Sequence, residues 1–475
     1  MTFHSPLSVL AGIFVVFAIG LFALSESGQD SALAQEVSPL VEPDGGGEFL
    51  LAPMDEITDE QREAIQKQIR ENVAKLQRSG RLAPARPEAV VLEWPTRKAA
   101  GLPDYGVDAV SNYVDQNAAF PNQLRDWNCG TRTYDRSNGY NHKGIDIFTW
   151  PFSWRKMDNN EAEVVAGAPG TIVLKSDGNF DRSCSFNSNS WNAIYVQHSD
   201  GSRAWYGHLK SGSLNAKAVG DTVVTGEKLG VIGSSGNSTG PHLHFELYNA
   251  AGQLQDPYQG PCNTLNTTTW WAAQEPYRAS RINSLILHSA PPSFNTCPAQ
   301  ETTNEKSLYR PGESVLAAAY YRDQTTAQSS QFSLIRPDGT VFQAWSHNSP
   351  NTYSSSYWFW SRTLPADAPL GEWKLRSVYN SETYERTFTV DVSASVAGRI
   401  LTPDERGLRN ALVTITDSQG VSRTVNTSSF GYFGFDRVAL GQQYTIRVAS
   451  KRYRFSARTV QVNDNLTGVD FAGQE

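Results

Sequence analysis

Two histidines stand two positions apart in the apolar stretch TGPHLHFELYNA, residues 239–250. Side chains alternate between the two faces of an extended strand, so His242 and His244 share one face with Glu246 and Tyr248. The opposite face is apolar and consists of Leu243, Phe245 and Leu247. The pattern predicts a strand with one face for a core and one face for chemistry, although a lone HxH is also typical of a solvated strand.

Two further stretches repeat this design. In NHKGIDIFTW, His142 and Asp146 lie four positions apart and share a face in a strand or in one helical turn. Ile145 and Ile147 fall on the opposite side as core residues, which favours the strand. In WYGHLK, strand alternation places His208 and Tyr206 on one face, with Trp205 and Leu209 opposed.

One sheet face that carries imidazoles and a carboxylate is what a metal site on a rigid scaffold requires. Zinc binds neutral imidazole and carboxylate, and a catalytic zinc site has three protein ligands and leaves a fourth position open. Such an ion brings the pKa of water close to neutrality, so the sequence predicts a hydrolase. Spacing alone does not decide which of His242 and His244 is the ligand, because both imidazoles can reach one ion.

The ordered motifs resemble the lysostaphin-type and β-lytic zinc metallopeptidases, which cut peptide cross-links of bacterial peptidoglycan. The resemblance runs over residues 90–265. It rests on HxxxD at His142 and Asp146, the APGTIV strand, GHL at residues 207–209, the block GDTVVTGEKLGVIGSSGNSTGPHLHFEL, and HxH at residues 242–244. The C-terminal segment GRILTPDERGLRNALVTITDSQG is similar to carboxypeptidase-regulatory-like sandwiches, which are accessory modules.

The resemblance implies a role for each site residue. It implies one Zn²⁺ ion held by His142, Asp146 and His244, with His208 and His242 beside the metal as the pair that handles protons. The chain has no HExxH motif and hence no glutamate base on a helix, and a histidine can fill that role. Tyr206 is a weaker candidate for contact with the oxyanion.

The predicted function is therefore a secreted zinc metalloendopeptidase that hydrolyses amide bonds in peptidoglycan cross-link peptides. Two alternatives stay open: a secreted zinc protease that acts on proteins, and a catalytically inactive wall-binding or amidase-activating scaffold. Relatives of the last kind lack one or more ligands, whereas all five positions are filled here. Glu246 lies outside the implied ligand set, and we expect it to be structural.

The N-terminus predicts export. Residues 7–24 are apolar and uncharged, and Ala32 and Ala34 give a small-x-small cleavage pattern before Gln35, although no Lys or Arg precedes the run. We expect a periplasmic or extracellular protein, with membrane contact only if this segment stays uncleaved as an anchor. Four cysteines in an oxidising compartment favour disulfides. The pairing with the shortest non-overlapping loops joins Cys129 to Cys184 and Cys262 to Cys297.

The remaining pattern predicts a mainly β chain of several domains. We expect a signal peptide or anchor at 1–34 and a spacer with a helical pro-region or linker at 35–89. An antiparallel β metallopeptidase domain is expected at 90–298, and two β-sandwiches at 299–393 and 394–475. Strand signals in the peptidase domain begin near Val90–Trp94.

One amphipathic helix is predicted ahead of the peptidase domain, from Thr58 to Ser79, with a capping box at Thr58 and Gln61. It is interpreted either as a pro-region that covers the cleft or as a helix packed on the next domain. The net charge is −7 without long runs of charge, which excludes a basic nucleic-acid footprint. The expected partner is peptidoglycan or another peptide substrate.

Overall fold

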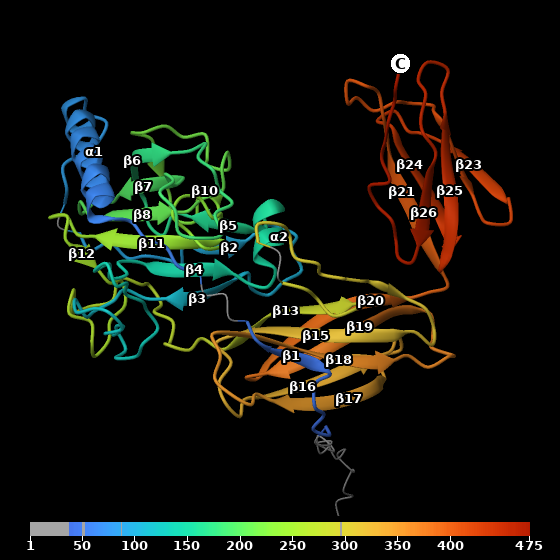
Figure 1. Ribbon diagram of the computed structural model, residues 1–475, viewed down its shortest axis with the longest axis horizontal. Helices are drawn as coiled ribbons and strands as arrows, with labels where there is room; N and C mark the ends of the chain where they lie inside the picture. The colour runs from blue at the N-terminus through green and yellow to red at the C-terminus, as the bar shows by residue number, and fades with distance from the viewer. Residues whose placement is uncertain (1–37, 50–52, 87, 295–296) are drawn as a thin grey trace, which may run out of the picture. The chain divides into compact units, whose positions relative to one another are not determined.

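The computed structural model describes residues 38–49, 53–86, 88–294 and 297–475 (Figure 1). This part of the chain is mainly β and contains two helices, which confirms the predicted fold class. The apolar run at 7–24 and the predicted cleavage site lie outside the described residues. Among the described residues, no helix is both long and apolar enough to span a membrane.

The largest sheet has eight strands and carries the candidate site. Its order is β3-β4-β11-β8-β7-β6-β9, with β12 paired to β11, and every neighbouring pair is antiparallel. The strands are β3 (Asp108–Asn112), β4 (Ile145–Thr149), β6 (Gly170–Ser176), β7 (Ala193–Gln197), β8 (Arg203–Gly207), β9 (Thr222–Val223), β11 (His242–Tyr248) and β12 (Leu254–Gln255).

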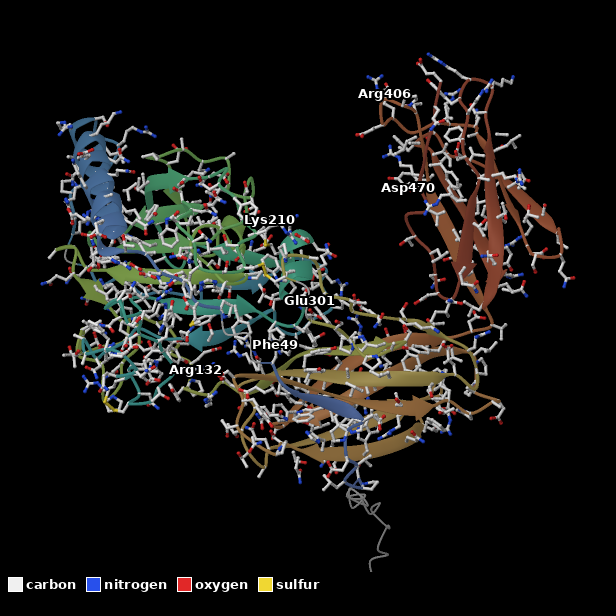
Figure 2. All side chains as sticks on the ribbon, viewed as in Figure 1. Phe49, Arg132, Lys210, Glu301, Arg406 and Asp470 are labelled. Atoms are coloured by element: carbon white, nitrogen blue, oxygen red, sulfur yellow. A yellow bond between two sulfur atoms is a disulfide. The ribbon has the colours of Figure 1, made fainter. Side chains whose placement is uncertain are left out.

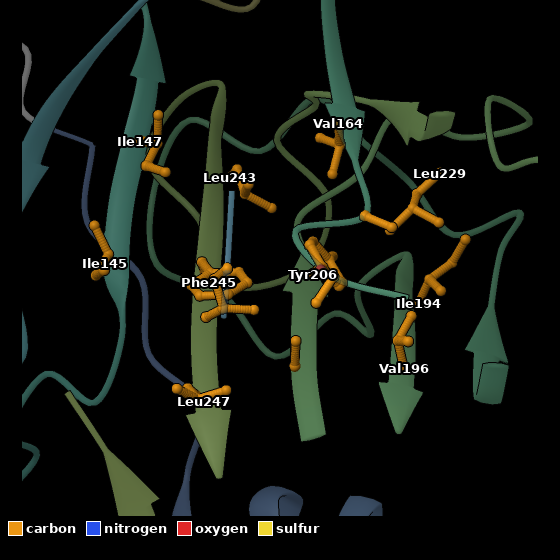
Figure 3. Close-up of a cluster of buried hydrophobic side chains, with 14 of the residues drawn as sticks. Ile145, Ile147, Val164, Ile194, Val196, Tyr206, Leu229, Leu243, Phe245 and Leu247 are labelled. Atoms are coloured by element: carbon orange, nitrogen blue, oxygen red, sulfur yellow. The ribbon is translucent and has the colours of Figure 1, made fainter. Parts of the chain in front are cut away.

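One face of this sheet packs on a second sheet of order β10-β5-β2. The second sheet consists of β2 (Thr96–Lys98), β5 (Ala162–Val165) and β10 (Lys228–Val231). The core between the sheets contains Ile145, Ile147, Leu243, Phe245 and Leu247, as the strand pattern predicts (Figure 3). Their burial on one face leaves the histidines of β11 on the other.

The start of this domain differs from the prediction. Val90–Trp94 forms only an isolated bridge, between Leu92 and Trp271, and the first strand is β2. Pro95, which directly follows this stretch, lacks the amide hydrogen that a longer ladder needs. A short helix, α2 (Ser153–Asp158), follows β4.

Helix α1 (Asp59–Arg78) begins at the predicted capping box, because Thr58 accepts from the Gln61 amide and the Gln61 side chain accepts from the Thr58 amide. Its apolar stripe, Ile69, Val73 and Leu76, is buried. The stripe belongs to the same cluster as Val173, Tyr195 and Trp205 of the large sheet and Trp191, which precedes β7. This packing stabilises the helix more than intrinsic helix propensity does.

A β-sandwich follows, and one of its strands comes from the N-terminal segment. One sheet has the order β1-β18-β15-β13 and the other β14-β20-β19-β16-β17. The strands are β1 (Gly45–Glu48), β13 (Arg281–His288), β14 (Leu308–Tyr309), β15 (Ser314–Arg322), β16 (Ser329–Ile335), β17 (Val341–Asn348), β18 (Ser355–Thr363), β19 (Gly371–Tyr379) and β20 (Glu382–Val390).

Two expectations are corrected by this sandwich. The segment expected to be a spacer supplies β1, whose glycines pair closely with β18, so a spacer without structure is wrong for Gly45–Glu48. Strand β13 precedes the expected boundary at residue 298 but pairs with β15. Strand pairing between distant segments decides both the structure of Gly45–Glu48 and the domain boundary. Local composition carries no signal for such pairing.

The C-terminal sandwich has two sheets, of orders β24-β21-β27 and β23-β22-β25-β26. Its strands are β21 (Ser393–Leu401), β22 (Leu412–Thr416), β23 (Ser422–Asn426), β24 (Tyr432–Ala439), β25 (Gln442–Ala449), β26 (Arg458–Val462) and β27 (Phe471–Ala472). Alternating residues such as Val413, Ile415 and Ile446 form its core. Arg406 and Asp470, labelled in Figure 2, belong to this domain.

Two disulfides join cysteines that are far apart in the sequence. Cys129 pairs with Cys262 and Cys184 with Cys297, at Cα separations of 5.1 and 6.1 Å. The predicted pairing is therefore wrong, because the shortest-loop criterion ignores the sheet topology. The Cys262 amide donates to the Trp127 carbonyl, which brings this cysteine beside Cys129.

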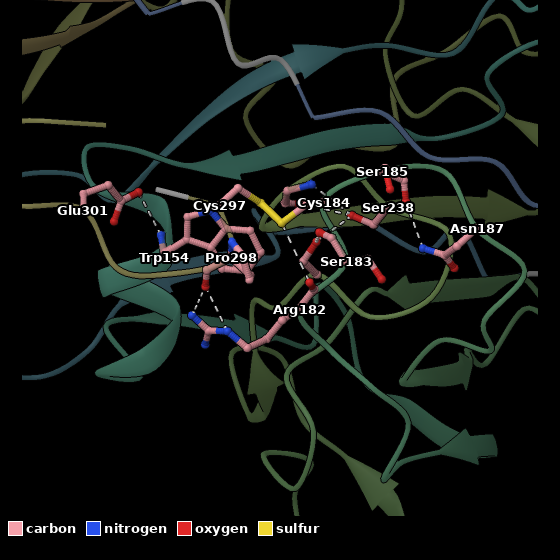
Figure 4. Close-up of a disulfide and its surroundings, with 12 residues drawn as sticks. Trp154, Arg182, Ser183, Cys184, Ser185, Asn187, Ser238, Cys297, Pro298 and Glu301 are labelled. Atoms are coloured by element: carbon pink, nitrogen blue, oxygen red, sulfur yellow. Dashed lines mark hydrogen bonds between the residues drawn. A yellow bond between two sulfur atoms is a disulfide. The ribbon is translucent and has the colours of Figure 1, made fainter. Parts of the chain in front are cut away.

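The second disulfide ties the loop between β6 and β7 to the segment that leads into the sandwich (Figure 4). Arg182 Nε donates to the Pro298 carbonyl oxygen over 3.0 Å. Glu301 accepts hydrogen bonds from the Trp154 and Arg155 amides at the start of α2. These hydrogen bonds hold the segment that follows Cys297 against the peptide around Arg182 and against α2.

Candidate metal centre

The structure brings all five predicted site residues together in one buried cluster. Asp146 lies in β4 and His242 and His244 in β11, and the pairing of these strands sets His244 opposite both Asp146 and Gly207. His208 directly follows β8. His142 lies in the loop before β4 and not in the strand, so the predicted strand position of this residue is wrong.

Three of these side chains converge with the separations of a zinc ligand set. His142 Nε2 lies 3.0 Å from Asp146 Oδ1 and 3.3 Å from His244 Nδ1. Asp146 Oδ1 and His244 Nδ1 are 2.9 Å apart. Ligand atoms at about 2.0–2.1 Å from a tetrahedral zinc ion are about 3.3 Å from one another. Two imidazole nitrogens and a carboxylate oxygen at these separations fit zinc.

The second nitrogen of each predicted ligand histidine is held by an acceptor that fixes the tautomer. His142 Nδ1 donates to the Tyr113 carbonyl over 2.8 Å, which leaves its Nε2 lone pair facing Asp146. His244 Nε2 donates to Glu246 Oε1 over 2.8 Å, which leaves Nδ1 for the centre. Glu246 thus positions a predicted ligand. Such outer contacts orient metal ligands and raise their basicity.

His208 and His242 form the other side of the cluster, with ring centroids 4.5 Å apart. His208 Nδ1 donates to the Ser235 carbonyl and His242 Nδ1 to the Gly240 carbonyl, so each Nε2 carries a lone pair. Within the described residues, His242 Nε2 has no hydrogen-bond partner. His208 Nε2 instead faces Asp55 Oδ2 at 2.8 Å, so of the two Nε2 atoms that of His242 is the uncovered one.

Tyr206 does not share a face with His208, which corrects the expectation for the oxyanion contact. It packs in the core between the two sheets, and its hydroxyl accepts from the Gly167 amide over 2.9 Å. His208 has a positive φ of 60°. This left-handed residue ends the strand and breaks the alternation, so its side chain lies with the face of Trp205.

Asp55 is a site residue that the sequence pattern did not reveal. Its Oδ2 lies 2.6 Å from His244 Nδ1 and 2.8 Å from His208 Nε2. Asp55 forms two four-residue groups that could hold a metal, one with the three predicted ligands and one with the three histidines at 208, 242 and 244. The residue precedes α1 in a stretch without periodicity, so no spacing signal points to it.

In this cluster, burial and the neighbouring charges shift the pKa values of the site residues in opposite directions. Burial raises the pKa of Asp146, but His142 and His242 hold it below the ordinary value of a carboxyl. Burial and the neighbouring His242 lower the pKa of His208. Burial lowers the pKa of His242, but the negative charges of Asp146 and Asp55, together with the bond to the Gly240 carbonyl, outweigh it and raise that pKa overall. The two histidines thus differ in proton affinity.

This antiparallel β domain holds two histidines and an aspartate at zinc-ligand separations, and two further histidines lie beside them. Such a fold and site are those of a metallopeptidase. The comparisons with known proteins agree. Residues 140–257 match the model of peptidase family M23, 302–392 match the MG2 domain, and 395–472 match the carboxypeptidase regulatory-like domain. The chain therefore contains a family M23 peptidase domain, which confirms the resemblance inferred from the motifs.

Curated relatives match part of the chain. The chain is 36% identical over 110 residues to glycyl-glycine endopeptidase ALE-1 of Staphylococcus capitis, covering 23% of this chain and 25% of that protein. It is 46% identical over 55 residues to DD-carboxypeptidase/endopeptidase Mpg of Neisseria meningitidis, 12% of each chain. It is 28% identical over 154 residues to peptidoglycan DD-endopeptidase ShyC of Vibrio cholerae, 29% of this chain and 34% of that one. The chain thus spans about a third or less of these relatives.

Among solved structures, the catalytic domain of lysostaphin from Staphylococcus simulans is 33% identical. The match covers 26% of this chain and 83% of that one, with a TM-score of 0.20.

Proposed function

We propose that the chain is an exported zinc endopeptidase that hydrolyses amide bonds in the cross-link peptides of peptidoglycan. The observation that carries the proposal is the convergence of His142, Asp146 and His244 beside two histidines whose Nδ1 atoms are held by backbone carbonyls. The names of three relatives, a glycyl-glycine endopeptidase, a DD-carboxypeptidase/endopeptidase and a peptidoglycan DD-endopeptidase, support the substrate class. Two disulfides and no free cysteine suit an oxidising compartment outside the cytoplasm.

His142, Asp146 and His244 would hold the ion. Zinc in such a site supplies Lewis acidity, which polarises an amide carbonyl and acidifies a water molecule. Asn112 Nδ2 donates to Asp146 Oδ2 over 3.0 Å and leaves Oδ1 to the centre. Together with the bond from His244 to Glu246, this contact keeps two ligands in place before substrate arrives.

His208 and His242 handle the protons of the reaction. The Nε2 atom of one histidine accepts a proton from the attacking water, and a protonated histidine beside it delivers one to the leaving amine. The Ser235 and Gly240 carbonyls hold both rings in the required tautomer. A positively charged imidazole also stabilises the oxyanion of the tetrahedral intermediate.

The inactive-scaffold alternative is disfavoured because all five positions are filled and buried together. Metal analysis of the purified full chain tests the centre directly, with one zinc ion per chain as the expected result. Mass spectrometry of fragments released from purified peptidoglycan tests the substrate, with His244→Ala as the inactive control. A zinc-loaded chain that cleaves casein and never peptidoglycan would replace this proposal with the general-protease alternative.

A further inference from the structure

The candidate centre is closed in this structure, which a working peptidase cannot be. His142, Asp146, His242 and His244 are 0% exposed and His208 is 1% exposed. A peptide bond must reach these atoms to be hydrolysed. The chain's own Asp55, also 0% exposed, lies where the substrate would have to arrive.

The Asp55 carboxylate is held by both of its oxygens. The Tyr134 and Tyr140 hydroxyls donate to Oδ1 over 2.6 and 3.1 Å. Oδ2 is left to face His244 Nδ1 at 2.6 Å and His208 Nε2 at 2.8 Å. It therefore lies between the ligand side and the proton-handling side of the cluster.

We propose that Asp55 is an intramolecular fourth ligand of the metal and keeps the enzyme latent, an inference that rests on the proposed function. Its carboxylate and the ligand atoms of His142, Asp146 and His244 all lie within 4.8 Å of one another. Two carboxylates and two neutral imidazoles carry two negative charges, which a divalent cation balances. A fourth protein ligand completes the tetrahedral set, and this is the arrangement of closed structural zinc sites and not of open catalytic ones.

The backbone around Asp55 is bound in extended form, as a peptide substrate would be. Asp55 makes an antiparallel bridge with Ser238, in the loop that leads into β11. The Glu56 amide donates to the Asn237 carbonyl and the Thr239 amide to the Met54 carbonyl. The segment therefore occupies a backbone-pairing edge beside the centre, and a substrate strand that used this edge would have to displace it.

Helix α1 anchors this segment from the other side. Arg62 forms a buried ion pair with Glu246, the same carboxylate that holds His244, and donates to the Tyr248 hydroxyl over 2.8 Å. A cavity of about 340 Å³ beside His208 is lined by Gln61 and Ile65 of the helix and by residues of the sheet. The helix thus forms a wall of the space that leads to the centre.

The experiment compares the full chain with Asp55→Ala and Asp55→Asn, and uses Asp59→Asn as the matched control. Asp59 belongs to the same segment, but its side chain is 83% exposed and pairs with Lys143. Zinc affinity is measured by competition with a chromophoric chelator. Access to the fourth position is measured by the binding of acetohydroxamate to the zinc-loaded chains.

Loss of the fourth ligand should weaken zinc binding about tenfold or more in Asp55→Ala, while one ion still binds at saturation. Acetohydroxamate should bind this variant and not the parent chain. Hydrolysis of peptidoglycan should rise about tenfold or more, because the parent is competent only in the small fraction of molecules that are open. Asp55→Asn keeps the side-chain shape and the contacts with the two tyrosines. Its zinc affinity, acetohydroxamate binding and hydrolysis rate should therefore lie between those of the parent and those of Asp55→Ala. Asp59→Asn should match the parent.

Unchanged zinc affinity and equal acetohydroxamate binding in Asp55→Asn and the parent would overturn the proposal. Because the asparagine variant is isosteric, this result stands even if Asp55→Ala fails to fold. If the metal measurements change as expected but no chain hydrolyses peptidoglycan, the fourth-ligand assignment stands and the proposed function fails.

Discussion

At the scale of single residues, the two histidines of β11 have different environments although they share one strand face. His244 Nδ1 lies 2.9 Å from Asp146 Oδ1, whereas His242 Nε2 lies 3.6 Å from the same atom. His244 is also held by a carboxylate, whereas His242 donates to a backbone carbonyl. Geometry thus supports His244 as ligand and His242 as proton carrier.

Alanine at each of these positions should separate the roles. His244→Ala removes a ligand, so zinc content and hydrolysis should fall together. His242→Ala should keep zinc and lower the rate about 100- to 10,000-fold, the usual contribution of general acid-base catalysis. Each substitution is made in the Asp55→Ala chain, and zinc content and the initial rate of hydrolysis are measured for each. Zinc lost from His242→Ala and kept by His244→Ala would reverse the assignment.

Asp256 should make stability depend on pH. Burial raises the pKa of its carboxyl from 3.8 to about 7, although the Tyr258 amide and Gln116 donate hydrogen bonds to it. Between these values the folded chain binds a proton that the unfolded chain does not, so this contribution is complete below about pH 4 and is lost as pH rises through about 7. It amounts to at most about 4 kcal/mol.

Asp256→Asn cannot titrate and serves as the comparison. The free energy of unfolding of the parent chain should fall relative to that of the variant as pH rises from 4 to 7. Urea unfolding at several pH values measures the difference. A difference that stays constant over this range would show that the carboxyl keeps its ordinary pKa.

At the scale of elements, α1 depends on one buried ion pair as well as on its apolar stripe. The side chains of Arg62 and Glu246 are 8% and 0% exposed. On the same helix, Arg70 pairs with Glu63, and both side chains are more than half exposed. Breaking a buried pair leaves an unpaired charge and costs about 3–5 kcal/mol, whereas an exposed pair contributes about 0–1 kcal/mol.

Arg62→Met should therefore loosen the helix, and Arg70→Met should not. Hydrogen exchange of the α1 amides should be faster in Arg62→Met, and hydrolysis of peptidoglycan should increase because the Asp55 segment is released more often. Glu246 keeps its bonds from His244 and Tyr248, so zinc should still bind. Equal exchange in the two variants would show that the apolar stripe alone holds the helix.

At the scale of the whole molecule, buried polar contacts and disulfides connect segments far apart in the sequence. Arg132, labelled in Figure 2, pairs with Asp323 of the sandwich over 2.8 Å. Arg322 pairs with Asp108 of β3 over 2.9 Å. The Cys184–Cys297 bridge closes a separation of 113 residues and the Cys129–Cys262 bridge one of 133.

Non-reducing peptide mapping should recover exactly these two cross-linked peptide pairs from the exported chain. Replacing Cys184 and Cys297 together by Ser should lower the melting temperature, because the chain-entropy model gives about 5 kcal/mol for a loop of this length. A peptide that joins Cys129 to Cys184 would contradict the structure. Four free thiols would contradict the export of the chain as well.

The sequence by itself determined the features that depend on short-range periodicity. Alternation along β11 separates the histidines from Leu243, Phe245 and Leu247, and the capping box marks the start of α1. These features could be predicted because a strand or a helix turn relates residues only a few positions apart. The motif order also indicated the five site residues and the peptidase family.

Only the tertiary structure decided the contacts between distant segments. The partner of each cysteine, the pairing of β1 with β18 and the insertion of Asp55 among the histidines all depend on chain topology. Tyr206 faces the core because a single left-handed residue, His208, reverses the alternation that the sequence suggests. Local propensity carries no information about such contacts, since their energy comes from burial and pairing after the chain has folded.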